Sequence, residues 1–319
     1  SNNINKSQVF TKKTQKGEFY FYKKPSQKIN TASLLREHLP NILTKITWNK
    51  SMKWGNHNFF WGRPLKSILS IFDGKKLDFN FYHLKSSNIT FIDKELEEKI
   101  KVFNSFKSYS SFFKSKGILI DQEKRKLFIS NEILKISKVK KIKINLKKEL
   151  LEEITNIVEK PKILFCEFDK KYLSIPKEIL IITMQSHQKY FPTFDNKDNL
   201  TNNFIVVADN KDSKGLIKLG NERVIEARLN DAEFFWKKNR SQNLVKQVSK
   251  LKNINYFKGL GSYFDKVQRI RKLCGIISDE MLISKEKIEI ASSICKVDLM
   301  SDLVGEFPEL QGIMGGYFA

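Results

Sequence analysis

The order of hydrophobic and polar residues predicts short strands and helices in the first 90 residues. Alternation between the two classes indicates a strand, and apolar residues three or four apart indicate a helix. The elements expected here are a strand over 18–22, a helix capped by Thr31 that Pro40 bends or divides, an aromatic loop over 54–64, a strand or short helix over 65–72 before an Asp73–Gly74 turn, and a strand over 79–84.

The middle of the chain continues this mixture of helix and strand. An apolar stripe at helical spacing predicts a helix over 94–116, with the residues Leu96, Ile100, Phe103, Phe106 and Phe113. A lysine-rich tract over 138–148 predicts a solvated loop, and a specific phosphate site is the alternative. The elements expected after it are a helix over 150–158, a strand over 163–168, a helix opened by Pro176, and strands near 190–194 and 204–208.

From Gly220 onward the pattern predicts helices only. Asn221 is the candidate cap of the first, whose apolar residues step by four, three and four along one face at Ile225, Leu229, Ala232 and Trp236. Two more helices are expected from about Asp265 and over 288–303. The prediction is an α+β multidomain chain with three parts: an N-terminal strand and helix segment over 1–60, an α+β body over 61–215, and an all-helical domain over 216–319.

Charge narrows the classes of partner. Lys and Arg number 58 against 35 Asp and Glu, a formal net charge of +23. Residues 1–160 carry 33 basic and 15 acidic side chains, so most of the excess lies in the first half. Such a field attracts polyanions, and nucleic acid is the obvious one. The alternative is drift toward the A- and T-rich codons of Lys, Asn, Ile and Phe, all abundant here.

The common signatures of catalysis and metal binding are missing from the sequence. Three cysteines and four histidines form no zinc spacing: Cys166, Cys274, Cys295, His38, His57, His83 and His187. There is no phosphate loop, no GxSxG and no HExxH, and Phe264 stands where a dinucleotide fingerprint after Gly259 needs its third glycine. We therefore expect no catalytic residue, no metal and no cofactor on this chain.

Two further features bear on the cellular location of the protein and on whether the chain is a piece of a longer one. No apolar stretch approaches the roughly 20 residues of a membrane span, and no signal peptide opens the chain, so a cytoplasmic protein without membrane contact is expected. The first residues are Ser1 and Asn2 rather than Met, which is typical of a piece excised from a longer protein.

Two segments carry a family resemblance. The first reads MQSHQKYFPTF over 184–194 and continues as NFIVVADN from Asn203; the second reads GNERVIEARLNDAEFF over 220–235 and continues as GLGSYFDKVQRI from Gly259. Together they resemble the beta subunit of the bacterial two-subunit glycyl-tRNA synthetase. The resemblance extends upstream through MKWGNHNFFWGRPL and downstream through KVDLMSDLVGEFPELQGIMGGYFA, so it covers nearly the whole chain.

The resemblance implies a role within a larger enzyme. In that family the alpha subunit holds the class II site where ATP, with Mg, and glycine react, and the beta subunit supplies most of the tRNA recognition in an assembly of two alpha and two beta subunits. The chain is then expected to bind tRNA-Gly and the alpha subunit and to be non-catalytic alone. A basic assembly module without RNA specificity is the alternative.

The resemblance also implies a domain order. The family's middle part is similar to RNA-binding modules of archaeal CCA-adding enzymes, and an HD-like helical domain and an anticodon-binding domain follow it. On this pattern the chain ends inside the HD-like domain. An HD phosphohydrolase needs histidine ligands beside an aspartate. No histidine follows His187, and the expected position reads Cys295-Lys296-Val297-Asp298, so phosphohydrolysis is not expected.

Individual tRNA contacts are predicted from basic residues, each with a structural alternative. His187 and Lys189 lie beside aromatics that stack an RNA end or simply pack a junction. Arg223 and Arg228 contact phosphate or a subunit, or Arg228 pairs with Asp231. The last helical turn carries cations that also suit the helix dipole. The full set is Arg63, Lys138, Lys140, Lys141, Lys143, His187, Lys189, Arg223, Arg228, Lys237, Lys238 and Arg240.

Overall fold

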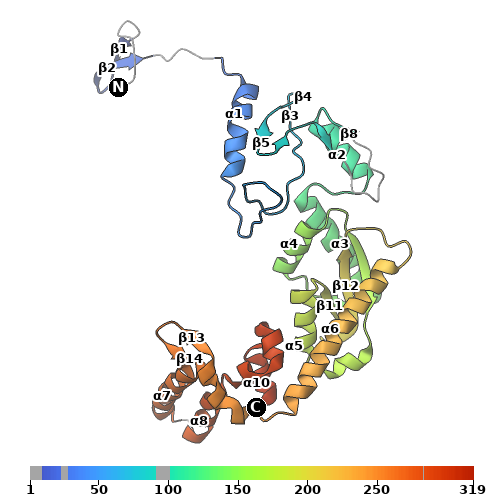
Figure 1. Ribbon diagram of the computed structural model, residues 1–319, viewed down its shortest axis with the longest axis vertical. Coiled ribbons are helices and arrows are strands. Elements are labelled where there is room, and N and C mark those ends of the chain that lie inside the picture. Colours follow the sequence, from blue (N-terminus) through green and yellow to red (C-terminus); the bar gives the residue numbers. More distant parts are fainter. Residues whose placement is uncertain (1–8, 23–27, 91–100, 283) are drawn as a thin grey trace. The chain divides into compact units, whose positions relative to one another are not determined.

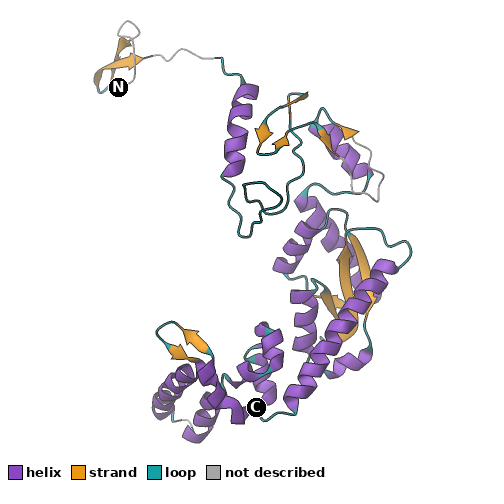
Figure 2. Cartoon of the chain, in the orientation of Figure 1, coloured by secondary structure: helices purple, strands orange, loops and turns teal. Residues whose placement is uncertain are grey.

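The computed structural model describes residues 9–22, 28–90, 101–282 and 284–319. The chain forms two compact units, Ser1–Phe112 and Phe113–Ala319 (Figure 1). Helices predominate and the sheets are small, which confirms a mixed α+β protein (Figure 2). The domain limits expected after residues 60 and 215 stay predictions.

The first unit contains one long helix, a hairpin of two six-residue strands and a series of two-residue strands. Its elements are β1 (Val9–Thr14), β2 (Gly17–Tyr22), α1 (Thr31–Thr44), β3 (Ile71–Phe72), β4 (Lys75–Lys76), β5 (Asn80–Phe81), β6 (Leu84–Lys85), β7 (Ile89–Thr90), β8 (Lys101–Val102) and α2 (Phe106–Ser115), which contains the division between the units. The strand expected over 18–22 is confirmed, because β2 pairs with β1 in an antiparallel hairpin.

Helix α1 differs from its prediction at its N-terminal cap. Asn30, not Thr31, is the cap, because its side chain accepts a hydrogen bond from the backbone N–H of Ser33. Pro40 lies inside the helix without dividing it. The partly buried Leu35, Leu39 and Leu43 of this helix pack against a small buried core that consists of Phe59, Leu77, Phe79 and Phe81.

Two tight hairpins organise the rest of this core. The Asp73–Gly74 turn is confirmed, with positive φ angles of 48° and 73° that suit a two-residue hairpin loop. The single strand expected over 79–84 is wrong, because the chain reverses at Tyr82–His83 between β5 and β6. The buried hydroxyl of Ser86 holds this hairpin against the segment before it. It accepts a hydrogen bond from the Phe79 N–H and donates one to the Leu77 carbonyl.

The helix expected over 94–116 begins later than predicted. Lys101 and Val102 form β8, which pairs with β7, and α2 starts only at Phe106. Phe103 is buried but precedes the helix. Pairing with the distant β7 therefore prevails over the local apolar spacing. Leu96 and Ile100 lie outside the described residues.

The second unit begins with a four-stranded antiparallel sheet and its covering helices. The elements are α3 (Gln122–Lys140), β9 (Lys143–Ile144), α4 (Lys148–Ile157), β10 (Lys162–Glu167), a 3-10 turn η3 (Lys170–Ser174), α5 (Lys177–Ile182), a π-helical turn η4 (Thr183–His187), β11 (Phe191–Phe194) and β12 (Leu200–Ala208). The strand order is β10-β12-β11-β9. The helix and strands expected over 150–208 are confirmed.

The sheet is buried on both faces because its strands alternate large apolar side chains. Ile205 of β12 packs with α3 and α4, whereas its neighbour Phe204 packs on the opposite face with α5 and α6. The lysine-rich tract is not a loop, since it includes the end of α3, strand β9 and the start of α4. Lys141 ends α3 in a left-handed conformation, with φ 54°.

The C-terminal part is mainly helical. Its elements are α6 (Leu216–Arg240), η5 (Leu244–Asn253), β13 (Asn255–Phe257), β14 (Gly261–Ser262), α7 (Tyr263–Met281), α8 (Lys285–Ile294), η6 (Val297–Met300), α9 (Asp302–Glu306), η7 (Pro308–Leu310) and α10 (Ile313–Phe318). The expectation of helices only is wrong, because β13 and β14 form a hairpin. The third helix expected over 288–303 is divided after Ile294.

Helix α6 joins the sheet to the C-terminal helices. It begins before Asn221, because the Asp212 carboxylate accepts from the backbone N–H groups of Ile217 and Lys218 and caps the first turn. At its other end the buried Asn239 accepts from the Leu303 N–H at 3.0 Å and donates to the Asp302 carboxylate at 3.2 Å. The predicted apolar face of α6 is confirmed as part of the core.

Candidate functional site

A cleft of about 490 Å³ opens where β12 ends in the second unit. Its lining residues come from helix α4, the turn before β11, the end of β12 and the start of α6; Figure 1 labels these elements. Its lining residues are Ile154, Ile157, Val158, Gln188, Lys189, Tyr190, Val206, Val207, Ala208, Asp209, Asn210, Ile217 and Asn221. The segments that carry the family resemblance, 184–194, 203–210 and 220–235, therefore meet here.

The turn before β11 fixes one wall of the cleft. After the π-helical turn η4, Lys189 adopts a left-handed conformation with φ 59°, and the Tyr190 N–H donates to the Met184 carbonyl at 2.8 Å. A left-handed lysine costs about 1–2 kcal/mol. The Lys189 ammonium forms an ion pair with Glu153 of α4 at 3.0 Å, which helps to hold this conformation. Strain of this kind is common at functional sites.

One hydrogen bond joins this wall to α6, and a second bond, within α6, orients its acceptor. The Tyr190 phenol donates to the side-chain oxygen of Asn221 at 2.6 Å, and the Asn221 amide donates to the Ile217 carbonyl at 2.7 Å. Tyr190 also stacks on Phe204, with ring centroids 5.0 Å apart. Burial raises the pKa of Tyr190 to about 12, so its phenol remains a hydrogen-bond donor at neutral pH.

The polar groups of the cleft divide into fixed and free ones. Asp209 is fixed, because its carboxylate accepts from the backbone N–H groups of Glu159 and Lys160 at 2.6 and 2.8 Å. The exposed Asn210 and half-buried Gln188 make no side-chain hydrogen bond with any residue that the structure describes. Apolar walls with free amide groups match a flat heteroaromatic ring, whose faces stack and whose edges hydrogen-bond.

His187 and Lys189, predicted together, have separate environments. Lys189 lines the cleft. The His187 ring lies on Phe307, with centroids 5.1 Å apart and an interplanar angle of 13°. His187 thus packs against the C-terminal helices, whereas its neighbours Gln188 and Lys189 face the cleft.

The lysines at the end of α3 have mixed surroundings. The Lys140 ammonium lies 5.1 Å from the centre of the Phe165 ring, and Lys143 pairs with Asp198 at 2.7 Å. Lys138 and Lys141 are exposed and form no ion pair within the described part of the chain.

The predicted cations of α6 are spread along its length. Arg223 and Arg228 are exposed, and neither forms an ion pair with a described residue, Asp231 included. Arg223 lines a hollow together with the acidic Glu167, Asp169, Glu222 and Glu226. In the last turn, the pairs are Lys237 with Glu233 at 2.7 Å and Lys238 with Asp302 at 2.9 Å.

Two predicted arginines are exposed without an ion pair to any described residue. They are Arg240 at the end of α6 and Arg63 of the first unit. The polar cleft residues outside the predicted set of tRNA contacts are Gln188, Tyr190, Asp209, Asn210 and Asn221, of which Asn221 was expected only as a helix cap. Their signal was the quoted motifs, because the segments 184–194, 203–210 and 220–235 each contribute residues to the cleft.

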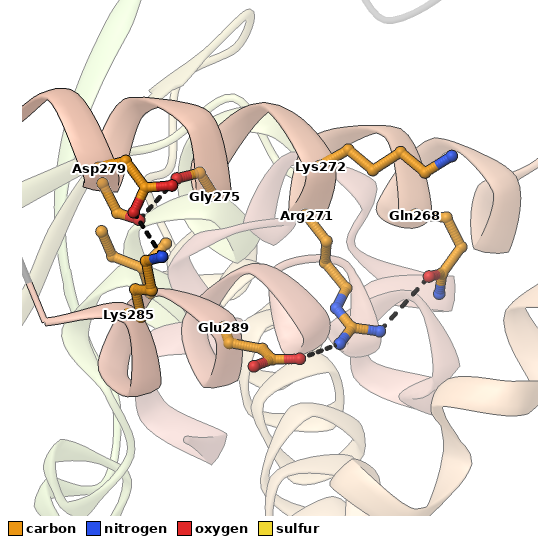
Figure 3. Close-up of a pocket in the computed structure, with 9 residues that line it drawn as sticks. Gln268, Arg271, Lys272, Gly275, Asp279, Lys285 and Glu289 are labelled. Atoms are coloured by element: carbon orange, nitrogen blue, oxygen red, sulfur yellow. Dashed lines mark hydrogen bonds and ion pairs between the residues drawn. The ribbon is translucent and has the colours of Figure 1, made fainter.

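A second cavity, of about 400 Å³, lies between α7 and α8 (Figure 3). Arg271 pairs with Glu289 of the facing helix and donates to Gln268, and Lys285 pairs with Asp279 at 2.6 Å. Arg271 and Lys285 therefore already have a carboxylate partner from the other helix, and these pairs fasten the two helices together. Lys272, the third cation of the lining, forms no ion pair with a described residue.

The aspartate expected at an HD-type metal centre has a structural role. Asp298 is buried, and its carboxylate accepts a hydrogen bond from the Gly312 N–H. No three His, Cys, Asp or Glu side chains converge as metal ligands among residues 9–22, 28–90, 101–282 and 284–319. Within those same ranges, no helix combines the length and the apolar character that crossing a bilayer requires.

Comparisons with known proteins agree on one family. The family model described as glycyl-tRNA synthetase beta subunit matches residues 1–319. A glycine–tRNA ligase beta subunit of Rickettsia bellii (strain OSU 85-389) is 36% identical over 320 aligned residues, which cover 100% of this chain and 48% of the relative. The protein of the same name from Rickettsia typhi (strain ATCC VR-144 / Wilmington) is 35% identical over 318 residues, which cover 99% of this chain and 47% of that relative. The chain spans about half the length of the curated relatives it matches.

Proposed function

The chain belongs to the glycyl-tRNA synthetase beta-subunit family, and on that premise we propose that it binds tRNA-Gly and supports its ATP-dependent glycylation at the class II site of an alpha subunit. ATP and Mg bind at the alpha subunit, and this chain holds no catalytic residue of its own. The assembly contains two alpha and two beta subunits in the cytoplasm. The names of the relatives and the net charge of +23 support this proposal.

The cleft at the end of β12 is our candidate contact for an unpaired RNA end. The observation that carries it is the pair of free amides, Gln188 and Asn210, between apolar walls at the meeting point of the family's motifs. An unstacked base is recognised by such a combination of ring stacking and edge hydrogen bonds. Lys189 lines the same cleft, and an adjoining phosphate would compete with Glu153, 3.0 Å away, for its ammonium.

The helical part from residue 216 is proposed to be an HD-like domain without phosphohydrolase chemistry. The helical character of α6 to α10 and the buried Asp298 near the end of this part support the assignment. The hydrogen bond from Gly312 occupies one oxygen of that aspartate, and Lys296 two residues before it disfavours a cation.

Fluorescence anisotropy with tRNA-Gly and a non-cognate tRNA, at about 50 and 200 mM salt, tests the proposal. We expect a preference for tRNA-Gly that persists at the higher salt. Equal binding that the higher salt abolishes would instead support a basic assembly module without RNA specificity.

Variants of the two free amides test the cleft itself. Gln188→Ala and Asn210→Ala are expected to weaken tRNA-Gly binding by about tenfold together, since each lost hydrogen bond is worth about 0.5–1.5 kcal/mol. The matched control is Asn253→Ala, which removes an exposed amide that lines no part of the cleft. If Gln188→Ala and Asn210→Ala bind tRNA-Gly as tightly as the control Asn253→Ala, the cleft does not contact the RNA.

A further inference from the structure

The first unit carries a second group of aromatic side chains that the cleft does not use. His57 and His83 stack with ring centroids 3.6 Å apart and an interplanar angle of 10°. Phe59 and Tyr82 stack at 4.2 Å and 9°. Trp54 lies edge-on to both histidines, at 6.4 and 6.2 Å. We call Trp54, His57, Tyr82 and His83 the aromatic face.

One side of this group belongs to the core and the other faces solvent. Phe59 is only 5% exposed, whereas Tyr82, stacked on it, is 55% exposed. His83 is exposed and rests on the half-buried His57. The exposed rings are therefore held in fixed positions by buried ones. A rigid aromatic surface loses little conformational entropy when it binds a ligand.

The backbone at this face is strained. Tyr82 has φ 50° in the two-residue turn between β5 and β6, a position that Asn or Gly usually occupies in a hairpin. The nearby hairpin between β3 and β4 has the residues expected there, Asp73 and Gly74. A bulky aromatic residue is thus kept at a strained position with its side chain in solvent. Strain of this kind is common at binding sites.

The segment that carries Trp54 and His57 has charged residues of one sign. Residues 45–66 include three of the four tryptophans of the chain and five cations, but no carboxylate. Lys53 of this segment donates to Asn58 at 2.8 Å and Arg63 is exposed, so neither charge is neutralised by an acid. Lys85 follows the strained turn by two residues. Phosphates are the complement of such a field, and bases are the complement of the rings.

We propose that the aromatic face binds single-stranded RNA by stacking unpaired bases, with the cations of 45–66 along the phosphates. This inference rests on the proposed function, namely that the chain binds RNA, and adds a site separate from the cleft. Stacking platforms among cations are the usual means of holding single strands without sequence preference. A protein partner is the competing class of occupant, and the test below separates the two.

The test uses the whole 319-residue chain and a labelled dodecauridylate, which has little structure of its own. Tyr82→Gly removes the ring, and glycine accepts the left-handed conformation at φ 50°, so the backbone of the turn should be kept. We expect this variant to bind the oligonucleotide about tenfold more weakly, since one base–aromatic stack has about that value. The matched control is Tyr20→Ala, because Tyr20 is an 82% exposed tyrosine of the same unit, and its effect should be below about twofold.

A direct readout accompanies the affinities. Ultraviolet cross-linking of the oligonucleotide, followed by peptide mass spectrometry, should label the peptides that contain Tyr82 or Trp54. Cross-links confined to other peptides, or equal affinities of wild type and Tyr82→Gly, would overturn the inference. If Tyr82→Gly keeps its RNA affinity but no longer captures the alpha subunit, the inference is also overturned, and the aromatic face binds a protein instead.

The outcome also separates this inference from the proposed function. If Tyr82→Gly leaves dodecauridylate binding unchanged while Gln188→Ala weakens tRNA-Gly binding, the aromatic face is excluded and the proposed function stands. If the wild-type chain binds neither RNA, both fail together.

Discussion

Tyr190 and Asn221 are joined by a 2.6 Å hydrogen bond between residues 31 positions apart in the sequence. The bond fastens the turn before β11 to the second turn of α6, and so connects the two segments on which the family resemblance rests. It also shapes one wall of the cleft. The stability of this connection is open to a direct test.

Tyr190→Phe removes the phenol and leaves the Asn221 oxygen without its donor. We expect a loss of about 1 kcal/mol in the free energy of unfolding, because the bond is partly buried. Urea unfolding followed by circular dichroism measures it. Tyr263→Phe is the control, since the hydroxyl of Tyr263 makes no hydrogen bond with the described residues. A Tyr190→Phe chain as stable as this control would contradict the prediction.

Lys189→Gly should separate RNA binding from stability. Glycine accepts the left-handed conformation at φ 59°, so the free energy of unfolding should stay within about 1 kcal/mol of wild type although the ion pair with Glu153 is lost. The affinity for tRNA-Gly should fall, as anisotropy measures. Lys141→Gly is the matched comparison, because it removes the same charge at φ 54° outside the cleft. An equal fall for both would indicate a general field rather than a cleft contact.

Stability should decline in alkaline solution because of two buried acids. Burial raises the pKa of the Cys166 thiol to about 12 from 9.0, and that of the Tyr190 phenol to about 12 from 10.0. The folded chain thus keeps protons that the unfolded chain releases. Their contribution to stability is complete below pH 9.0 and is lost progressively as the pH rises toward 12.

Urea midpoints measured across that alkaline range check this expectation. Cys166→Ala should be less stable at neutral pH, because it leaves a cavity among buried side chains, but its stability should fall less steeply above pH 9.0. Parallel pH profiles for the two proteins would show that the thiol does not contribute.

Two glycine substitutions should change stability in opposite directions. A Cβ at Gly62 would lie 2.7 Å from the Trp48 ring, so Gly62→Ala is expected to cost about 1–3 kcal/mol in the first unit. A Cβ at Gly220, inside α6, meets no atom within 4 Å, so Gly220→Ala should stabilise the second unit by about 0.5–1 kcal/mol. Thermal unfolding of both variants decides the signs, and a common sign would contradict this packing.

The sequence predicted elements best where one face is apolar and the other polar. The helix from Asp265 and the strand over 163–168 have this character, and both are confirmed. Helix α3 was missed because its apolar residues do not share a face: Leu127 and Val139 are exposed while Ile129 and Ile133 are buried. Apolar residues distributed in this way show no clear helical spacing in the sequence.

The cleft was predicted only in part. His187 and Lys189 stood out through their own motif, but Asn210 and Asn221 reach the same place through long-range structure. Strand β12 pairs with β11, which brings Asn210 back toward Tyr190, and α6 then passes beside it. Pairing between distant segments leaves no mark in local spacing. The motifs were therefore informative as a set, and their individual cations less so.

Helix α6 fixes a length as well as a connection. Its Asn221 borders the cleft and its Asn239 binds α9, and at 1.5 Å per residue these two asparagines are about 27 Å apart along one unbroken rod. The unbroken helix therefore keeps the cleft and the contact with α9 at a fixed separation.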